Sequence, residues 1–152
     1  MDASAKHWHD GVGGIGALNQ QAGNGAKPMV DSDASALAEA WIAQLAEVPG
    51  DVFGAVWRLC LDEPEKAFQF VLEVLRRDHS NKVQEGLSAG PLEDVLAKHG
   101  ERMIERVEAE AQSNPLFAKL LGGVWQNDLS DEVWRRVQAV WDRRGWDGIP
   151  ED

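Results

Sequence analysis

The sequence has no tyrosine, a single cysteine and no long apolar run. Because Cys60 is the only thiol, an internal disulfide and a multi-cysteine zinc site are both excluded. No stretch of about 18 apolar residues is present, so we expect no membrane-spanning helix. The first residues lack the charged-then-apolar pattern of a signal peptide, which favours a cytoplasmic protein.

Basic residues are also scarce. The chain has 15 Lys and Arg against 26 Asp and Glu, and its formal net charge is −11. Binding to a phosphate backbone or to an anionic membrane surface needs a surplus of basic residues, so we expect neither kind of partner. A negative field steers the approach of a positive surface, so the expected partner is a basic protein. The oligomeric state stays open.

Motifs for cofactor or metal chemistry are missing. There is no phosphate-binding loop, nucleophile elbow or His-Glu-x-x-His pair in a fitting context. Residues 11–16 match Gly-x-Gly-x-x-Gly, but no strand-like run precedes them. No Glu-x-x-His pair is available for a di-metal centre. We therefore expect no cofactor, no metal and no catalytic residue, and an enzyme is the less favoured hypothesis.

The chain changes character near residue 31. Residues 1–31 contain six glycines and few large apolar residues, which predicts a flexible glycine-rich tail. From residue 32 onward no segment alternates as a strand does, and apolar residues recur at helical spacing. We predict an all-α fold: a single compact domain of seven or eight short helices over 32–146, followed by a C-terminal tail over 147–152.

The third predicted helix, from about residue 62 to residue 77, is the expected centre of the core. Its apolar residues cover about 200° of the helix surface, which indicates packing on two sides. They are Phe68, Phe70, Val71, Leu72, Val74 and Leu75. The last helix is predicted from the N-cap Ser130 to about Arg144.

Residues 89–100 read AGPLEDVLAKHG and carry start and stop signals for a short separate helix. Gly90 is the predicted N-cap, Pro91 takes the first helical position, and Glu93 can complete a capping box. Gly100 is the predicted C′ residue. The segment is therefore expected to form a sharp corner before the next helix.

The same segment invites an acid/base interpretation through Glu93, Asp94 and His99. His99 lies five residues after Asp94, about 140° further around a helix, so the two side chains do not share a face. Asp94 instead adds favourable charge near the helix N-terminus, and a partner-binding role for it stays open. The alternative function is an enzyme whose site assembles around His99 and a carboxylate from elsewhere in the chain.

A second acidic feature follows at once. Glu101, Glu105 and Glu108 fall within an arc of about 60° on one helix, away from its apolar side. We interpret this face either as solvated or as a docking surface for a basic partner.

Seven tryptophans are unusual in a chain of this length. Those on apolar lines are predicted to pack in the core, namely Trp41, Trp57, Trp134 and Trp141. The others lie outside clear stripes and are candidates for exposed partner-binding anchors, namely Trp8, Trp125 and Trp146.

Three blocks carry a family resemblance: AGPLEDVLAKHG at 89–100, LLGGVW at 120–125 and VWRRV at 133–137. Together they resemble a family of small bacterial all-helical domains of unknown function, with Gly-Pro-Leu-Glu-Asp as the most specific motif. The similarity covers about residues 40–141. It implies a bacterial, helical, single-domain protein and brings no activity with it.

These patterns lead to one functional expectation. The chain is expected to be a non-enzymatic, acidic, helical protein-binding module, of the type of an inhibitor or immunity protein, that docks a basic partner. Its candidate partner-binding residues are Asp94, Glu101, Glu105, Glu108, Trp125 and Trp146.

Overall fold

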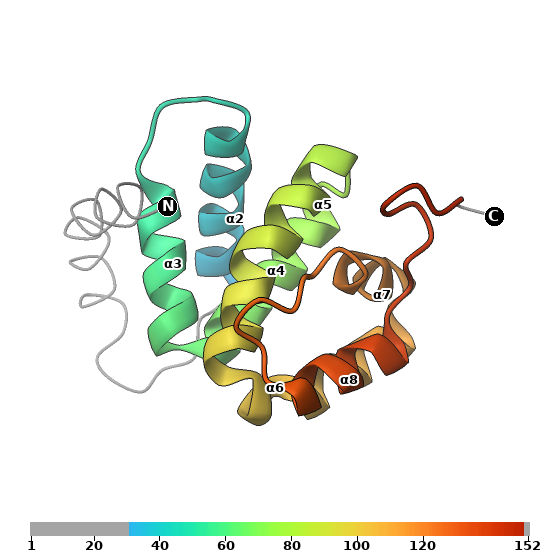
Figure 1. Cartoon of the computed structure of the whole chain (residues 1–152). Helices are drawn as coiled ribbons and strands as arrows, with labels where there is room; N and C mark the ends of the chain where they lie inside the picture. The colour runs from blue at the N-terminus through green and yellow to red at the C-terminus, as the bar shows by residue number, and fades with distance from the viewer. Residues whose placement is uncertain (1–30, 151–152) are drawn as a thin grey trace. The chain divides into compact units, whose positions relative to one another are not determined.

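A computed structural model of the chain describes residues 31–150 (Figure 1). All regular elements over this range are helices, so the all-α prediction is confirmed. The predicted tail and its Trp8 lie outside the described residues, apart from Asp31. No helix in 31–150 is long and apolar enough to cross a membrane. The chain divides at residues 77 and 78 into two compact units, which we describe one at a time.

The first unit is built around its third helix. Its elements are α2 (Asp31–Leu45), α3 (Val52–Asp62) and α4 (Pro64–Arg77). Helix α4 packs against both α2 and α3, as its wide apolar arc predicted. All of the predicted apolar residues of α4 are buried except Leu72, which is partly exposed. Cys60 on α3 is a free cysteine and is fully buried.

The turn between α2 and α3 is fastened by a side chain. The Oε1 atom of Gln44 accepts hydrogen bonds from the backbone N–H groups of Val52 and Phe53, at 2.8 and 3.2 Å. It thereby caps the N-terminus of α3, whose N-cap residue Asp51 makes no side-chain cap. One amide oxygen from α2 thus satisfies two backbone donors of the next helix.

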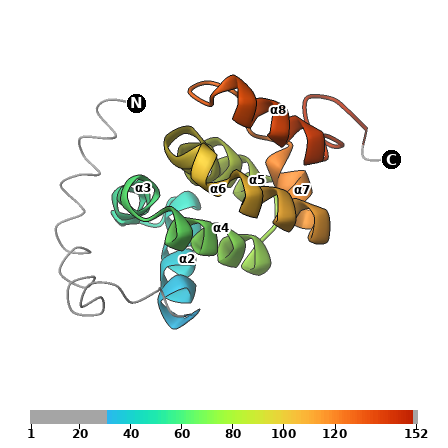
Figure 2. The ribbon, with the colours of Figure 1, turned by 90° about the horizontal axis from the view of Figure 1, so that it is seen from below.

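The second unit contains one long helical run, with a π-helical segment inside it, and two shorter helices. Its elements are α5 (Asn81–Leu87), a π-helical segment (Ser88–Leu92), α6 (Glu93–Ser113), α7 (Pro115–Leu121) and α8 (Asp131–Val140). Helices α7 and α8 both pack against α6 (Figures 1 and 2). Asn114 and Ser130 cap α7 and α8 through side-chain oxygens, and Ser130 was the predicted cap. Helix α8 ends at Val140, four residues earlier than predicted.

The predicted separate helix over 89–100 is wrong. The run from α5 to α6 continues without a break through Gly90, so Gly90 is not an N-cap and Glu93 completes no capping box. Pro91 has no N–H to donate, and the wider π-helical turn accommodates it inside the run. Gly90, Pro91 and Glu93 match the local preferences of a helix start, but they lie inside a helical run that begins at Asn81.

Gly100 does not end the helix either. The backbone bends at His99, with φ −136° and ψ 27°, and then continues to Ser113. A Cβ on Gly100 would lie 2.9 Å from Cγ2 of Val133 on α8. The glycine at this position therefore serves the close approach of α8 to α6, and the bend stands one residue before it.

Candidate functional site

The loop between α7 and α8 is held in place from α6. The carboxylate of Glu93 accepts hydrogen bonds from the backbone N–H of Trp125 at 3.3 Å and from Nδ2 of Asn127 at 2.9 Å. Between these two residues, Gln126 reaches α8, because its Nε2 donates to Oδ1 of Asp131 at 2.9 Å. Glu93 thus fixes the loop that leads into α8, a role that its expected capping box did not suggest.

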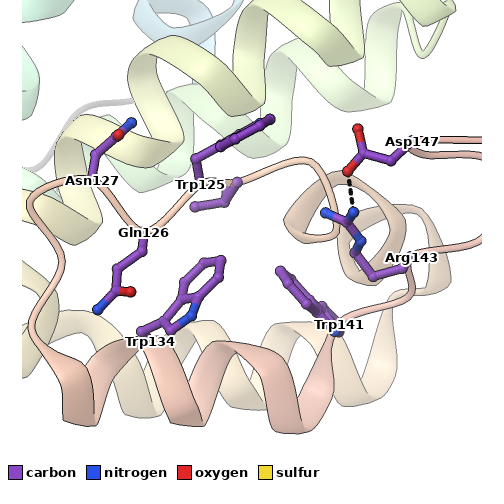
Figure 3. Close-up of a pocket in the computed structure, with 8 residues that line it drawn as sticks. Trp125, Gln126, Asn127, Trp134, Trp141, Arg143 and Asp147 are labelled. Atoms are coloured by element: carbon purple, nitrogen blue, oxygen red, sulfur yellow. Dashed lines mark hydrogen bonds and ion pairs between the residues drawn. The ribbon is translucent and has the colours of Figure 1, made fainter.

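This loop, α8 and the segment that follows α8 line an open pocket of about 390 Å³. Figure 3 shows three of the lining residues: Trp125 on the loop, Trp134 on α8 and Trp141 just after α8. The rings of Trp134 and Trp141 meet edge to face, with centroids 5.2 Å apart and planes at 89°. The side chain of Trp125 is 62% exposed. The pocket is therefore walled largely by indole surface.

The expectation that Trp134 and Trp141 lie in the core is wrong, because both are only partly buried. The buried stripe of α8 consists of Val133 and Val137 alone. Trp134 follows Val133, so it stands about 100° further around the helix and points out of the stripe. In the first unit Trp41 is buried as predicted, whereas Trp57 is partly exposed.

One guanidinium borders the pocket, and its charge is balanced. Arg143 lies over the ring of Trp141, with its Cζ 4.9 Å from the ring centroid. Its Nη1 donates to the backbone oxygen of Gly122 at 2.8 Å, and its Nη2 pairs with the carboxylate of Asp147 (Figure 3). The pocket therefore presents an ion pair rather than an unbalanced positive charge.

Trp146 differs from Trp125, although both were expected to be exposed anchors. Its Nε1 donates to the backbone oxygen of Lys119 at 2.7 Å. Its ring lies so close to Gly123 that a Cβ there would stand 2.6 Å from ring carbon Cη2. Trp146 is only partly exposed and attaches the C-terminal segment to α7, so its exposure was predicted wrongly.

The three glutamates of α6 do not form one free acidic face. Glu101 and Glu105 are exposed, but Glu108 is partly buried. Its two carboxylate oxygens accept from Nε and Nη2 of Arg136 on α8, at 2.8 and 2.6 Å. These bonds lower the pKa of Glu108 and raise that of Arg136. The pair joins α6 to α8, and the partner-binding role of the three residues stays a prediction.

Asp94 does not stand at a helix N-terminus, because the helical run begins at Asn81. Burial raises its pKa to about 6, and the neighbouring Glu93 adds to the rise. Its expected favourable interaction with a helix dipole is therefore replaced by a desolvation penalty.

Asp94→Asn is expected to stabilise the protein near neutral pH and to have little effect near pH 4. The unfolded-state pKa of Asp is about 3.9, below the folded value, so the folded state loses stability as the pH rises from about 4 to about 6. Because Asp94 is partly exposed, the expected gain at about pH 7 is roughly 1 kcal/mol. Urea denaturation at both pH values measures it, and an equal gain at both would contradict the assignment.

His99 borders a second hollow, of about 460 Å³, at the bend of α6. Asp128, Glu101 and Arg102 also line it. A histidine and carboxylates thus share one cavity, and Asp94, which the spacing placed on a different helix face from His99, does not line it. Over residues 31–150, no group of three or more His, Cys, Asp or Glu side chains is placed to hold a metal ion.

The model of a family of unknown function, DUF6869, matches residues 51–145. The chain belongs to this family. No curated protein and no solved structure matches it. The expected membership of a family of unknown function is confirmed, whereas the bacterial origin and the role of Gly-Pro-Leu-Glu-Asp as the family mark stay predictions.

The DUF6869 match covers most of the pocket but not all of the structure. The loop, α8, Trp141 and Arg143 lie inside it. Trp146 and Asp147 lie just beyond it, and so does the whole of α2 at the other end. The sequence did not predict the pocket, because each tryptophan was assigned to the core or the surface from the apolar pattern of its own helix. The spacing of Trp134 and Trp141, seven residues apart, was the signal that could have joined them.

Proposed function

We propose that this DUF6869 chain is a non-enzymatic protein-binding module that docks a basic partner, in the manner of an inhibitor or immunity protein. The observation that carries the proposal is a pocket of three tryptophans, one of them largely exposed, on a chain of net charge −11. Tryptophan is enriched at the hot spots of protein interfaces, and exposed apolar surface with a polar rim marks such sites. The expected bacterial origin and cytoplasmic setting are part of this proposal.

The acidic side chains of α6 support the choice of a basic partner. Glu101 and Glu105 are exposed, and Glu105 acts electrostatically on Arg136 of α8. Such charges raise the rate of encounter with a positive surface more than they raise the final affinity. Glu108 contributes less to this field because Arg136 neutralises it.

Affinity purification from the lysate of the source organism tests the proposal. The full chain is expected to retain a basic protein in stoichiometric amount, and Trp125→Ala is expected to weaken that binding about ten-fold or more. Reversing the charge of Glu101 and Glu105 to Lys is expected to slow association and to reduce its salt dependence. Glu108 is left unchanged, because its reversal would disrupt the pair with Arg136.

The controls separate binding from folding. Circular dichroism and urea denaturation must show that each variant keeps the stability of the wild type. The absence of any stoichiometric partner, or a partner that binds Trp125→Ala as tightly as the wild type, would contradict the proposal.

A second candidate function is acid/base catalysis in the hollow at the bend of α6. The observation that favours it is that His99 and Asp128 line the same cavity. A panel of ester, amide and phosphate substrates tests it. Turnover that is lost in both His99→Gln and Asp128→Asn would support this candidate, and no turnover on the panel would count against it.

A further inference from the structure

The inside of the tryptophan pocket suits an uncharged group. Its walls are formed by Trp125, Trp134 and Trp141 together with Val124. The one cation at its border, Arg143, already lies over Trp141. Asp147, which also lines the pocket, pairs with this guanidinium, so the lining has no net charge to attract an ion.

The geometry of the rings favours an aromatic group over an aliphatic one. Trp134 and Trp141 are already in an edge-to-face pair, and Trp125 lines the same pocket (Figure 3). A ring inserted there can form further edge-to-face or offset contacts, each worth roughly 0.5–1.5 kcal/mol beyond its buried area. The volume of about 390 Å³ is near the lower end for ligand pockets, which fits one large side chain.

On one side of the pocket, two carboxylates lie one hydrogen bond behind the lining residues. Gln126 and Asn127 line the pocket, and each is hydrogen-bonded to a carboxylate, Asp131 and Glu93 respectively. An amide donor orients a carboxylate without neutralising its charge. On the opposite side, the charges of Arg143 and Asp147 cancel. The local field therefore favours a positive group beside Gln126 and Asn127.

We propose that the tryptophan pocket receives one aromatic side chain of a basic partner segment, next to a Lys or Arg that faces Glu93 and Asp131. This inference deepens the proposed protein-binding function and rests on it for the origin of the segment. It names the recognised element as an aromatic residue with a basic neighbour.

Short capped peptides test the inference without knowledge of the natural partner. The first probe is acetyl-Lys-Phe-Lys-amide, and the matched probes replace Phe by Gly, replace both Lys by Glu, or consist of acetyl-trimethyllysine-amide alone. Binding to the ¹⁵N-labelled full chain is followed through the indole N–H resonances of Trp125, Trp134 and Trp141. The buried Trp41 of the first unit serves as the internal reference.

The Lys-Phe-Lys probe is expected to shift the three pocket resonances and not that of Trp41. It is expected to bind at least about five-fold more tightly than the Gly probe and the Glu probe. Trp125→Ala is expected to weaken it about ten-fold. Asp131→Asn keeps the oxygen that accepts from Gln126 and removes the charge, so it is expected to reduce the preference for Lys over Glu about two-fold.

Three results would overturn the inference. They are no shift of the pocket resonances, equal binding of the Phe and Gly probes, and tighter binding of trimethyllysine, which would make the pocket a cation site. Each is distinct from failure of the proposed function. A natural partner that depends on Trp125 would still support a binding module when the Phe probe fails. A bound Phe probe with no stoichiometric natural partner would support the pocket chemistry alone.

Discussion

Gly122→Ala is expected to lower the free energy of unfolding of the second unit by about 3 kcal/mol. A Cβ on Gly122 would overlap the backbone oxygen of Asp142 and would lie 2.9 Å from its carbonyl carbon and 3.1 Å from the backbone oxygen of Lys119. Gly122 has ordinary helical angles, φ −62° and ψ −18°, so the requirement for glycine comes from this contact and not from backbone strain.

The surrounding backbone has little freedom to move aside. The N–H of Asp142 donates to the oxygen of Ala118 at 2.9 Å, and Nη1 of Arg143 donates to the oxygen of Gly122 at 2.8 Å. Relief of the clash would break one or both of these bonds. Because Arg143 and Trp141 border the pocket, the same substitution is expected to weaken binding of the Lys-Phe-Lys probe.

Gly90→Ala is the matched control. A Cβ there meets no atom within 4 Å, and the residue lies inside the π-helical segment. Alanine is expected to leave stability unchanged or to raise it by up to about 1 kcal/mol, through lower entropy of the unfolded chain. Urea denaturation followed by far-ultraviolet circular dichroism measures both variants. Equal stabilities for Gly122→Ala and Gly90→Ala would show that the contact at Gly122 does not constrain the fold.

Trp41→Ala is expected to destabilise the first unit by about 4 kcal/mol. Trp41 is 4% exposed, and its ring lies 6.0 Å from the rings of both Phe53 on α3 and Phe70 on α4. Its removal leaves a cavity where the three helices of the unit meet. Because α2 precedes the DUF6869 match, a large effect would show that the folded unit extends beyond the family boundary.

Trp125→Ala provides the control for the same chemical change. Trp125 is 62% exposed, so its loss is expected to change stability by less than about 0.5 kcal/mol. Urea denaturation compares the two variants, and hydrogen exchange of α2, α3 and α4 locates the loss caused by Trp41→Ala. A small effect at Trp41, or a large one at Trp125, would contradict the assignment of one tryptophan to the core and the other to the surface.

The residues of 89–100 show where local reasoning failed. Gly90, Pro91 and Glu93 obey the known preferences of a helix start, yet the helix runs through them. Capping preferences describe what a residue does if a helix begins there, and they carry no information on whether one already exists. Ser88 and Leu92 on the π-helical segment are buried, and the segment packs against α7. The carboxylate of Glu93 therefore takes part in no cap, and it accepts a hydrogen bond from the backbone N–H of Trp125.

The acidic face predicted for α6 is only partly exposed, and the reason is related. The sequence placed Glu101, Glu105 and Glu108 on one side of a helix, and the spacing was correct. Only the packing of α8 against α6 set Arg136 opposite Glu108 and left the other two exposed. A helical wheel predicts which residues share a face but not which neighbour covers part of it.

Composition and periodicity by themselves determined the all-α class, the buried face of α4 and the impossibility of an internal disulfide. These properties follow from residue counts and from the repeat of one helix, both of which are local. Only the tertiary structure decided the tryptophan pocket, the contact of Gly122 with Asp142 and the pairing of Glu108 with Arg136. Each joins residues from different elements, and the spacing within one element contains no record of which elements meet.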